Sequence, residues 1–274
     1  MNKHMAATDR EPPQHDLIST RIERREQGNV AYITVTNEQR RNALPVEGRL
    51  ALSKIVKAIS NDGDLRVVVL SGAGDKSFIG GANINEMSVF PDPVIAEEGS
   101  RTTHLAGHAI RQCPVPVIAR INGYCLGAGM EIGASCDMRV ASTNAMFGMP
   151  EVKYGLPSGM EAALLPRLVG WGKAQELVFT GEMIDAQEAF QCGFVQRLVP
   201  PEKLDEATEQ WVSSILAAGP MAIRIQKELN RDWERMSIAD AVQQGIRAVG
   251  RAHNTGEPRR MMEAYLARRA KEKK

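Results

Sequence analysis

Two glutamates follow glycine-containing turns in this sequence, and their surroundings suit proton transfer. Glu131 comes after an apolar run, an Asn122-Gly123 turn and a tight Gly127-Ala128-Gly129. Glu151 follows Phe147-Gly148-Met149-Pro150, twenty residues later. Carboxyl groups act as general acids and bases, and partial burial can raise a glutamate pKa towards neutrality. Two acids beside exposed backbone N–H groups are what proton transfer next to a polarised carbonyl needs.

A second glycine-rich loop, Phe78 to Ile84, offers similar backbone features. It contains Gly80, Gly81 and Ala82 and lies between a strand pattern and a possible helix. Small residues let a ligand approach the backbone, and N–H groups at the start of a helix can bind developing negative charge. An ordinary turn is the simpler explanation of this loop alone. Two such corners together suggest a pair of N–H donors that converge on one oxygen.

Other kinds of site fit these residues less well. A dinucleotide-binding fingerprint needs G-x-G-x-x-G, whereas in Gly127, Gly129 and Gly133 the last glycine comes one residue too late. No Gly-Lys-Ser/Thr follows either loop, which excludes a P-loop. Taken singly, Glu131 complements a helix dipole and Glu151 is a surface residue after a proline. Their combination behind two loops favours acid–base chemistry.

Three further side chains have explanations other than catalysis. His104 and His108 would share a helix face, as metal ligands can, but no third ligand lies nearby. Ser158 lacks the G-x-S-x-G context of a nucleophile and fits a capping box with Glu161, ahead of a helix over 162–169. The sequence therefore predicts neither a metal site nor a nucleophilic serine.

The elements that must position these loops alternate between helices and apolar strands. Strands are expected over 31–36, 66–70, 117–121 and 138–141, and helices over 50–59, 96–111 and 130–136. A second capping box begins at Asp185, and the pattern from Pro201 to Leu266 is helical, with breaks near 219–220 and 256–258. This alternation predicts an α/β fold with parallel strand pairing.

Length and composition limit the class of protein. The 274 residues, 43% apolar and 24% charged, suit one large globular domain or two small ones. A net charge of +1 favours neither nucleic acid nor an anionic membrane as a partner. The four cysteines lack metal-site spacing, and we find no pattern of a signal peptide or transmembrane helix. We therefore expect a cytoplasmic protein with a disordered N-terminal arm over residues 1–16.

Several segments, in order along the chain, resemble the enoyl-CoA hydratase/isomerase (crotonase) family. Arg41-Asn42-Ala43-Leu44 is similar to an early family motif, and Phe78 to Met87 to the first oxyanion loop. Residues 116–137 are similar to the central motif. The similarity spans about Ile22 to Leu266 and includes segments 147–151, 165–170, 180–182 and 186–195.

This resemblance implies a fold, an assembly and a ligand. The fold is α/β, a crotonase-like spiral of ββα units with a helical C-terminal trimerisation region. The spiral core would cover residues 17–200 and the helical region residues 201–274, which packs homotrimers or, as paired trimers, hexamers. The ligand would be an acyl-CoA thioester. No metal or other cofactor is implied, because coenzyme A is part of the substrate.

The resemblance also implies roles for single residues. The thioester oxygen would lie in an oxyanion hole made by the backbone N–H groups of Ala82 and Ala128. Glu131 would activate the water that adds to a trans-2-enoyl-CoA, and Glu151 would deliver a proton, which gives a 3-hydroxyacyl-CoA. The alternative activity is that of a Δ3-Δ2 enoyl-CoA isomerase or another acyl-CoA lyase. Further substrate-binding positions are Gly80, Gly81, Ile84, Gly127, Gly129 and Arg41.

One segment departs from the family pattern. Residues 155–163 are one residue shorter than the glycine-rich stretch of many hydratases, and they should shape the acyl pocket together with residues 86–110. A non-catalytic acyl-CoA-binding or RNA-binding protein of the same fold is the alternative from another class. The intact pair Glu131 and Glu151 argues against that alternative.

Overall fold

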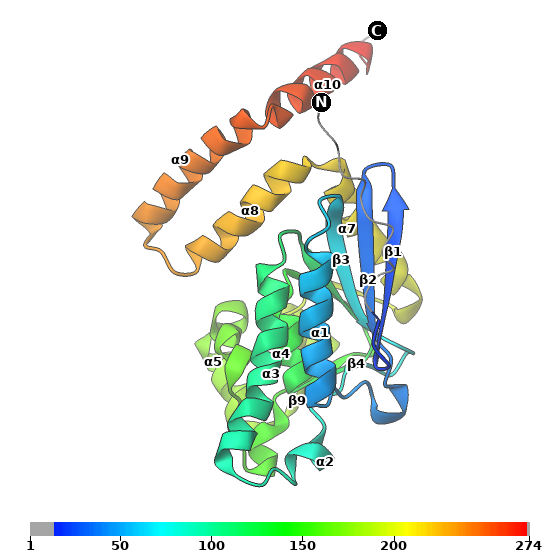
Figure 1. The fold of residues 1–274 in the computed structure, drawn as a ribbon, viewed down its shortest axis with the longest axis vertical. Coiled ribbons are helices and arrows are strands. Elements are labelled where there is room, and N and C mark those ends of the chain that lie inside the picture. The colour runs from blue at the N-terminus through cyan, green and yellow to red at the C-terminus, as the bar shows by residue number, and fades with distance from the viewer. Residues whose placement is uncertain (1–13, 273–274) are drawn as a thin grey trace, which may run out of the picture.

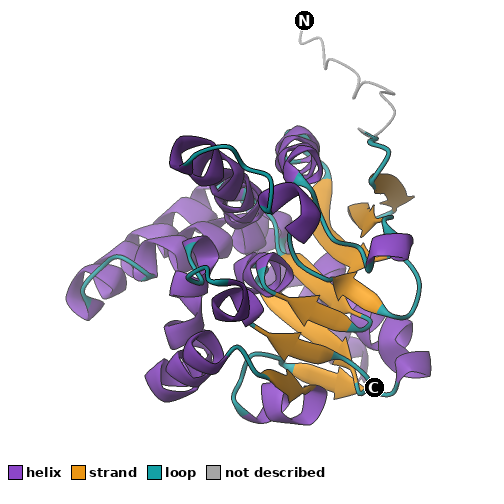
Figure 2. Cartoon of the chain, turned by 90° about the horizontal axis from the view of Figure 1, so that it is seen from below, coloured by secondary structure: helices purple, strands orange, loops and turns teal. Residues whose placement is uncertain are grey.

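The structure, a computed structural model, describes residues 14–272 and arranges their strands in two mixed sheets. The larger sheet has the order β1 (Ile18–Arg25), β2 (Gly28–Val35), β3 (Leu65–Gly72), β5 (Val117–Ile121), β7 (Met138–Ser142), β10 (Arg197–Val199). The smaller sheet has the order β4 (Ser77–Ile79), β6 (Tyr124–Leu126), β8 (Met146–Gly148), β9 (Met183–Asp185). Figure 2 shows the strands stacked between helices. The β1–β2 and β8–β9 pairs are antiparallel, and the other described pairs are parallel.

Helices fill the connections and the C-terminal part of the chain. The α-helices are α1 (Val46–Ile59), α2 (Ile84–Met87), α3 (Pro93–Gln112), α4 (Ala128–Ser135), α5 (Leu165–Thr180), α6 (Ala186–Gln191), α7 (Leu204–Ala217), α8 (Pro220–Trp233), α9 (Ile238–Asn254) and α10 (Glu257–Glu272). The short 3-10 helices among residues 14–272 are η1 (Glu38–Arg40), η2 (Pro150–Tyr154), η3 (Met160–Leu164) and η4 (Pro201–Lys203).

The chain repeats one unit, a strand in each sheet followed by a helix. β5, β6 and α4 form such a unit, and β3 and β4 with the helices α2 and α3 form the one before it. Since successive units pair in parallel in both sheets, the chain winds as a spiral. The predicted α/β fold with a spiral of ββα units is confirmed.

Helices cover both faces of the larger sheet. Val68 and Leu70 of β3 pack in the main core with α1 and α3, whereas Val67 and Val69 face α7 in a second apolar cluster. A strand buried on both faces explains the continuous apolar run in the sequence. The helix α7 thus packs on the sheet, although it falls within the region predicted as C-terminal.

The last three helices extend away from the sheets (Figure 1). The helix α9 exposes a row of aliphatic side chains on one face, and Ile246, for example, is 61% accessible. This apolar stripe consists of Ile238, Val242, Ile246 and Val249. No helix within residues 14–272 is long and apolar enough to cross a bilayer.

Several local expectations differ from the structure. Residues 1–13, most of the predicted arm, lie outside the described residues, and the side chain of Gln14 donates to the Thr20 carbonyl (2.7 Å). The glycine-rich loop expected from Phe78 to Ile84 begins inside the short strand β4. Asp185 is confirmed as a helix N-cap, because its side chain accepts from the Glu188 N–H (2.8 Å), whereas the side chain of Glu188 pairs with Lys173. The capping box at Ser158 is wrong, since η3 begins at Met160, with Gly159 as its N-cap and no side-chain cap.

Candidate active site

A cavity of about 450 Å³ is lined by both glycine-rich loops and by both glutamates. The predicted site residues that line it are Gly80, Gly81, Ala82, Ile84, Gly127, Ala128, Glu131 and Glu151. The segment expected to wall an acyl pocket contributes Met87, Ser88, Phe90, Gly99, Ser100 and Thr103. The structure therefore brings together residues as far apart in the sequence as Gly80 and Glu151.

Glycine is required at both corners of the cavity. Gly81 has φ of 115° and Gly127 has φ of 52°, in the region that residues with a Cβ rarely adopt. The Leu44 N–H donates to the Gly81 carbonyl, and the Gly127 N–H donates to the Gly148 carbonyl, both at 2.9 Å. These bonds fix the two turns and hence the direction of the N–H groups that follow them.

Ala82 and Ala128 come directly after these glycines. Ala128 is the first residue of α4, so its N–H has no acceptor one turn earlier in the helix. Ala82 precedes Asn83, the N-cap of α2, and its N–H makes none of the turn and loop hydrogen bonds found in residues 14–272. Two such donors at one cavity could stabilise a single developing oxyanion.

Glu131 lies in the first turn of α4 and is 2% exposed. The Ala162 N–H donates to its Oε1 at 3.1 Å. Burial, aided by the charges of Glu151 and Glu161, raises the pKa of Glu131 to about 8, although the Ala162 bond opposes this change. Glu131 therefore loses its proton at a higher pH than an exposed glutamate does.

Glu151 lies in η2 and lines the same cavity as Glu131. Burial raises its pKa, and the Ser158 hydroxyl, which donates to Oε2 at 2.8 Å, partly offsets the rise. A Cβ on Gly127 would lie 2.5 Å from Oε1 of Glu151. The second acid therefore packs directly against the turn that presents the Ala128 N–H.

Two predicted substrate-binding residues lie outside the cavity lining. A Cβ on Gly129 would be 2.0 Å from the Ile79 carbonyl, so this glycine allows α4 to approach β4. The guanidinium of Arg41 lies over the ring of Tyr124, 5.1 Å from its centroid. Its contact with coenzyme A stays a prediction.

Sequence reasoning missed the groups that hold the two acids. Ser158 and Glu161 were expected to bond within a capping box, whereas Ser158 bonds to Glu151 and Glu161 bonds to His104 at 2.8 Å. The Glu161–His104 pair spans 57 positions, so no local pattern could have revealed it. The hydrogen bond that supports Glu131 comes from the backbone N–H of Ala162. A backbone donor is present in nearly every residue, so the sequence holds no side chain that could reveal it.

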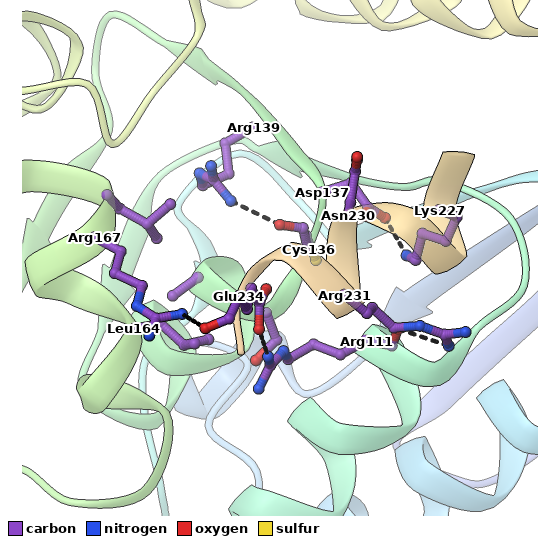
Figure 3. A pocket seen from close by; sticks show the side chains of 13 residues that line it. Arg111, Cys136, Asp137, Arg139, Leu164, Arg167, Lys227, Asn230, Arg231 and Glu234 are labelled. Atoms are coloured by element: carbon purple, nitrogen blue, oxygen red, sulfur yellow. Dashed lines mark hydrogen bonds and ion pairs between the residues drawn. The ribbon is translucent and has the colours of Figure 1, made fainter. Parts of the chain in front are cut away.

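A second cavity, of about 200 Å³, lies between the end of α4 and the helix α8 (Figure 3). Lys227 is ion-paired with Asp137, and Arg111 with Glu234. Arg139 donates to backbone carbonyls at the end of α4. Because each of these cations already has a protein partner, we assign the cluster to the attachment of α8 to the core.

The two histidines of α3 do not form a metal site. His104 is bonded to Glu161, and its ring lies 5.5 Å from that of His108. Across residues 14–272, no three His, Cys, Asp or Glu side chains are placed to hold a metal ion together.

The family model for enoyl-CoA hydratase/isomerase matches residues 25–273. The chain belongs to this family. This crotonase is 34% identical over 247 residues to a short-chain-enoyl-CoA hydratase of Clostridium acetobutylicum, which covers 89% of this chain and 93% of that relative. It is also 34% identical over 247 residues to an (E)-benzylidenesuccinyl-CoA hydratase of Thauera aromatica, covering 88% and 94% of the two chains.

A solved structure shows the same fold. The enoyl-CoA hydratase of Bacillus anthracis superposes on the crotonase with a TM-score of 0.87 at 30% identity, and the match covers 92% of this chain and 96% of that one. The predicted family and fold are therefore confirmed, and an acyl-CoA substrate follows from the family.

Proposed function

We propose that this crotonase hydrates a trans-2-enoyl-CoA to the 3-hydroxyacyl-CoA. The observation that carries the proposal is that Glu131 and Glu151 line the same cavity as the N–H groups of Ala82 and Ala128. The thioester oxygen would accept from both N–H groups as enolate charge develops, and loss of one such donor costs about 3–4 kcal/mol of barrier. Moving a double bond needs one acid, so the second supports hydration over the Δ3-Δ2 isomerase alternative.

Hydration and its reverse use the same single proton in two positions. In hydration, Glu131 as a carboxylate takes a proton from the attacking water, and protonated Glu151 gives one to the α-carbon. In dehydration, Glu151 as a carboxylate removes the α-proton, and protonated Glu131 assists the departing hydroxyl. In the free protein, burial makes Glu131 hold the shared proton more firmly than Glu151 does. A proton on Glu131 is the arrangement that dehydration needs. Both directions thus require an acid pair that carries one proton.

The cavity wall supports an uncharged acyl group. Apolar side chains dominate the wall, among them Ile84, Met87, Phe90, Leu156 and Met160. The two relatives named for a short-chain acyl group and for benzylidenesuccinyl-CoA are equally identical to this chain. Overall similarity therefore does not choose the acyl group, and a panel of enoyl-CoA thioesters is the way to rank them.

Assembly and location belong to the same proposal. The apolar stripe of α9 supports subunit association as a homotrimer or hexamer, because exposed apolar rows of this kind are buried in oligomers. The four cysteines are free thiols, which supports a reducing, cytoplasmic location.

The decisive variant is Glu151→Gln, with Glu182→Gln as a matched control. Glu182 is an exposed carboxylate, and it is paired with Lys153. Lys153 lies two residues after Glu151 in the sequence, so the control is close to the tested acid. We expect Glu151→Gln to abolish hydration of crotonyl-CoA and Glu182→Gln to retain it, with both proteins folded. Hydration retained by Glu151→Gln would refute the role of this acid. Oxygen from labelled water should appear in the product of hydration and would be absent from that of an isomerase.

A further inference from the structure

A third carboxylate, Glu161, lies behind the wall of the candidate active site. It is 4% exposed and belongs to η3, the short helix that closes over α4. Its Oε1 is bonded to Nδ1 of His104 at 2.8 Å, while the side chain of His104 is half exposed. The pair therefore joins the protein interior to solvent on the α3 side.

The fold makes room for this carboxylate. A Cβ on Gly107 would lie 2.8 Å from the carboxyl carbon of Glu161 and 2.7 Å from the Ser135 hydroxyl. That hydroxyl donates to the Glu131 carbonyl at 2.9 Å. The other oxygen of Glu161, Oε2, is buried and has no hydrogen-bond partner among residues 14–272. An unsatisfied buried oxygen is costly, so it calls for a role that offsets the cost.

Glu161 is also joined to Glu131 through the backbone. The next residue, Ala162, provides the N–H that binds Oε1 of Glu131 at 3.1 Å. Moving η3 would therefore move both the hydrogen bond and the charge that act on Glu131. Glu161 is therefore tied to Glu131, one acid of the pair, through the residue next to it in the chain.

The charges around both carboxylates are few. Arg49 from α1, Glu151 from η2 and Glu161 from η3 act on Glu131. His104 and Arg111, both from α3, act on Glu161, and Arg111 is already paired with Glu234 of the segment after α8. Arg49 is tied to Thr102 and to backbone carbonyls. Glu161 is thus the nearby charge that a single conservative change can remove without touching the cavity lining.

We propose that Glu161, kept as an anion by the hydrogen bond from His104, is a positioning residue that holds the single proton of the acid pair on Glu131. This inference rests on the hydratase function proposed above. A carboxylate close to another disfavours ionisation of its neighbour, and the effect is large away from water. Burial raises the pKa of Glu161 itself, whereas the hydrogen bond with His104 counteracts the rise and so favours the negative charge.

The first test is the pH dependence of kcat/KM for crotonyl-CoA in Glu161→Gln. Without the negative charge of Glu161, Glu131 should lose its proton more readily. The basic limb, which is the fall of kcat/KM at high pH, should therefore move to lower pH by on the order of one pH unit. His104→Ala should move the basic limb in the same direction, by no more than the shift seen in Glu161→Gln. His104→Asn, which keeps a donor to Glu161, should restore the wild-type limb, and His108→Ala is the matched control on the same helix.

A purely structural role for Glu161 would lower kcat or thermal stability in these variants and leave the basic limb unmoved. An unmoved limb in folded Glu161→Gln overturns the proposal. If the wild-type protein hydrates no enoyl-CoA, the proposed function fails, and the inference is then tested without turnover. The Glu131 carboxyl signal of protein labelled with 13C at the glutamate δ-carbon, assigned by its loss in Glu131→Gln, should titrate at lower pH in Glu161→Gln.

Discussion

Replacing Gly127 by alanine should disable the candidate site without removing any group that takes part in the reaction. The new Cβ would lie 2.5 Å from Oε1 of Glu151, and ordinary contacts need about 3.5 Å. The carboxyl group would have to retreat by about 1 Å. Because it ends a flexible side chain, the retreat itself costs little free energy of folding.

Gly127→Ala should instead lower the reaction rate and strain the backbone at residue 127. A displacement of about 1 Å at a reacting group lowers activity on the order of 100-fold. Alanine at φ of 52° and ψ of −124° is strained by about 1–3 kcal/mol, and relief of that strain would turn the Ala128 N–H away from the substrate oxygen. We expect kcat/KM for crotonyl-CoA to fall at least 100-fold, with a loss of about 1–3 kcal/mol in the free energy of unfolding.

Gly133→Ala is the matched control because it adds the same methyl group inside α4, the helix that Gly127 precedes. Its Cβ would meet Cys125 Sγ at 3.5 Å, an ordinary contact. Activity should be unchanged, and helix stability should rise by about 0.5–1 kcal/mol. Steady-state kinetics and denaturant unfolding of both variants provide the comparison. Wild-type kcat/KM in Gly127→Ala would refute the site, and equal losses in both variants would show only that α4 is sensitive to change.

Three further predictions concern protonation and assembly. The kcat/KM of the wild type should fall above about pH 8, where Glu131 loses the last proton of the acid pair. It should also fall at low pH, where both Glu131 and Glu151 are protonated. A kcat/KM that stays constant across pH 8 would contradict this prediction. Folding raises the pKa of Glu131 from 4.5 to about 8, so the folded state keeps a proton that the unfolded chain releases, and stability falls as pH rises through that window. Glu131→Gln should therefore gain thermal stability over the wild type as pH increases, which scanning calorimetry at several pH values can check. Ile246→Glu, in the stripe of α9, should reduce the sedimentation coefficient, and a wild-type monomer would refute the proposed association.

The larger sheet could be predicted from the sequence because its strands carry strong patterns. The apolar run at 117–121 is the whole of β5, and helix α3 extends the predicted range by only a few residues at each end. The smaller sheet was missed because β4, β6, β8 and β9 have three residues each, too few for any periodicity. The strand β1 was missed because its charged residues mask the alternation.

The position of the cavity could be predicted from sequence motifs. The hydrogen-bond partners of the buried acids around it could not. Ser158 and Glu161 have the spacing of a capping box, and the local pattern gave the wrong partners because tertiary contacts with Glu151 and His104 replaced it. Gly129 was grouped with its neighbour Gly127, although alternate positions in this turn face the cavity and the sheet. Local spacing identifies where backbone turns occur, and burial decides which polar group each side chain meets.

The hydrogen bonds to the two acids come from one short stretch of chain. Ser158 holds Glu151 and the Ala162 N–H holds Glu131, so residues 158–162, which include the start of η3, carry both supports. In a chimera, grafting this segment onto a related enzyme would transfer both hydrogen bonds in one step. Changes within these residues can therefore alter the supports of both acids together, while the glycine corners and the acids themselves stay in place.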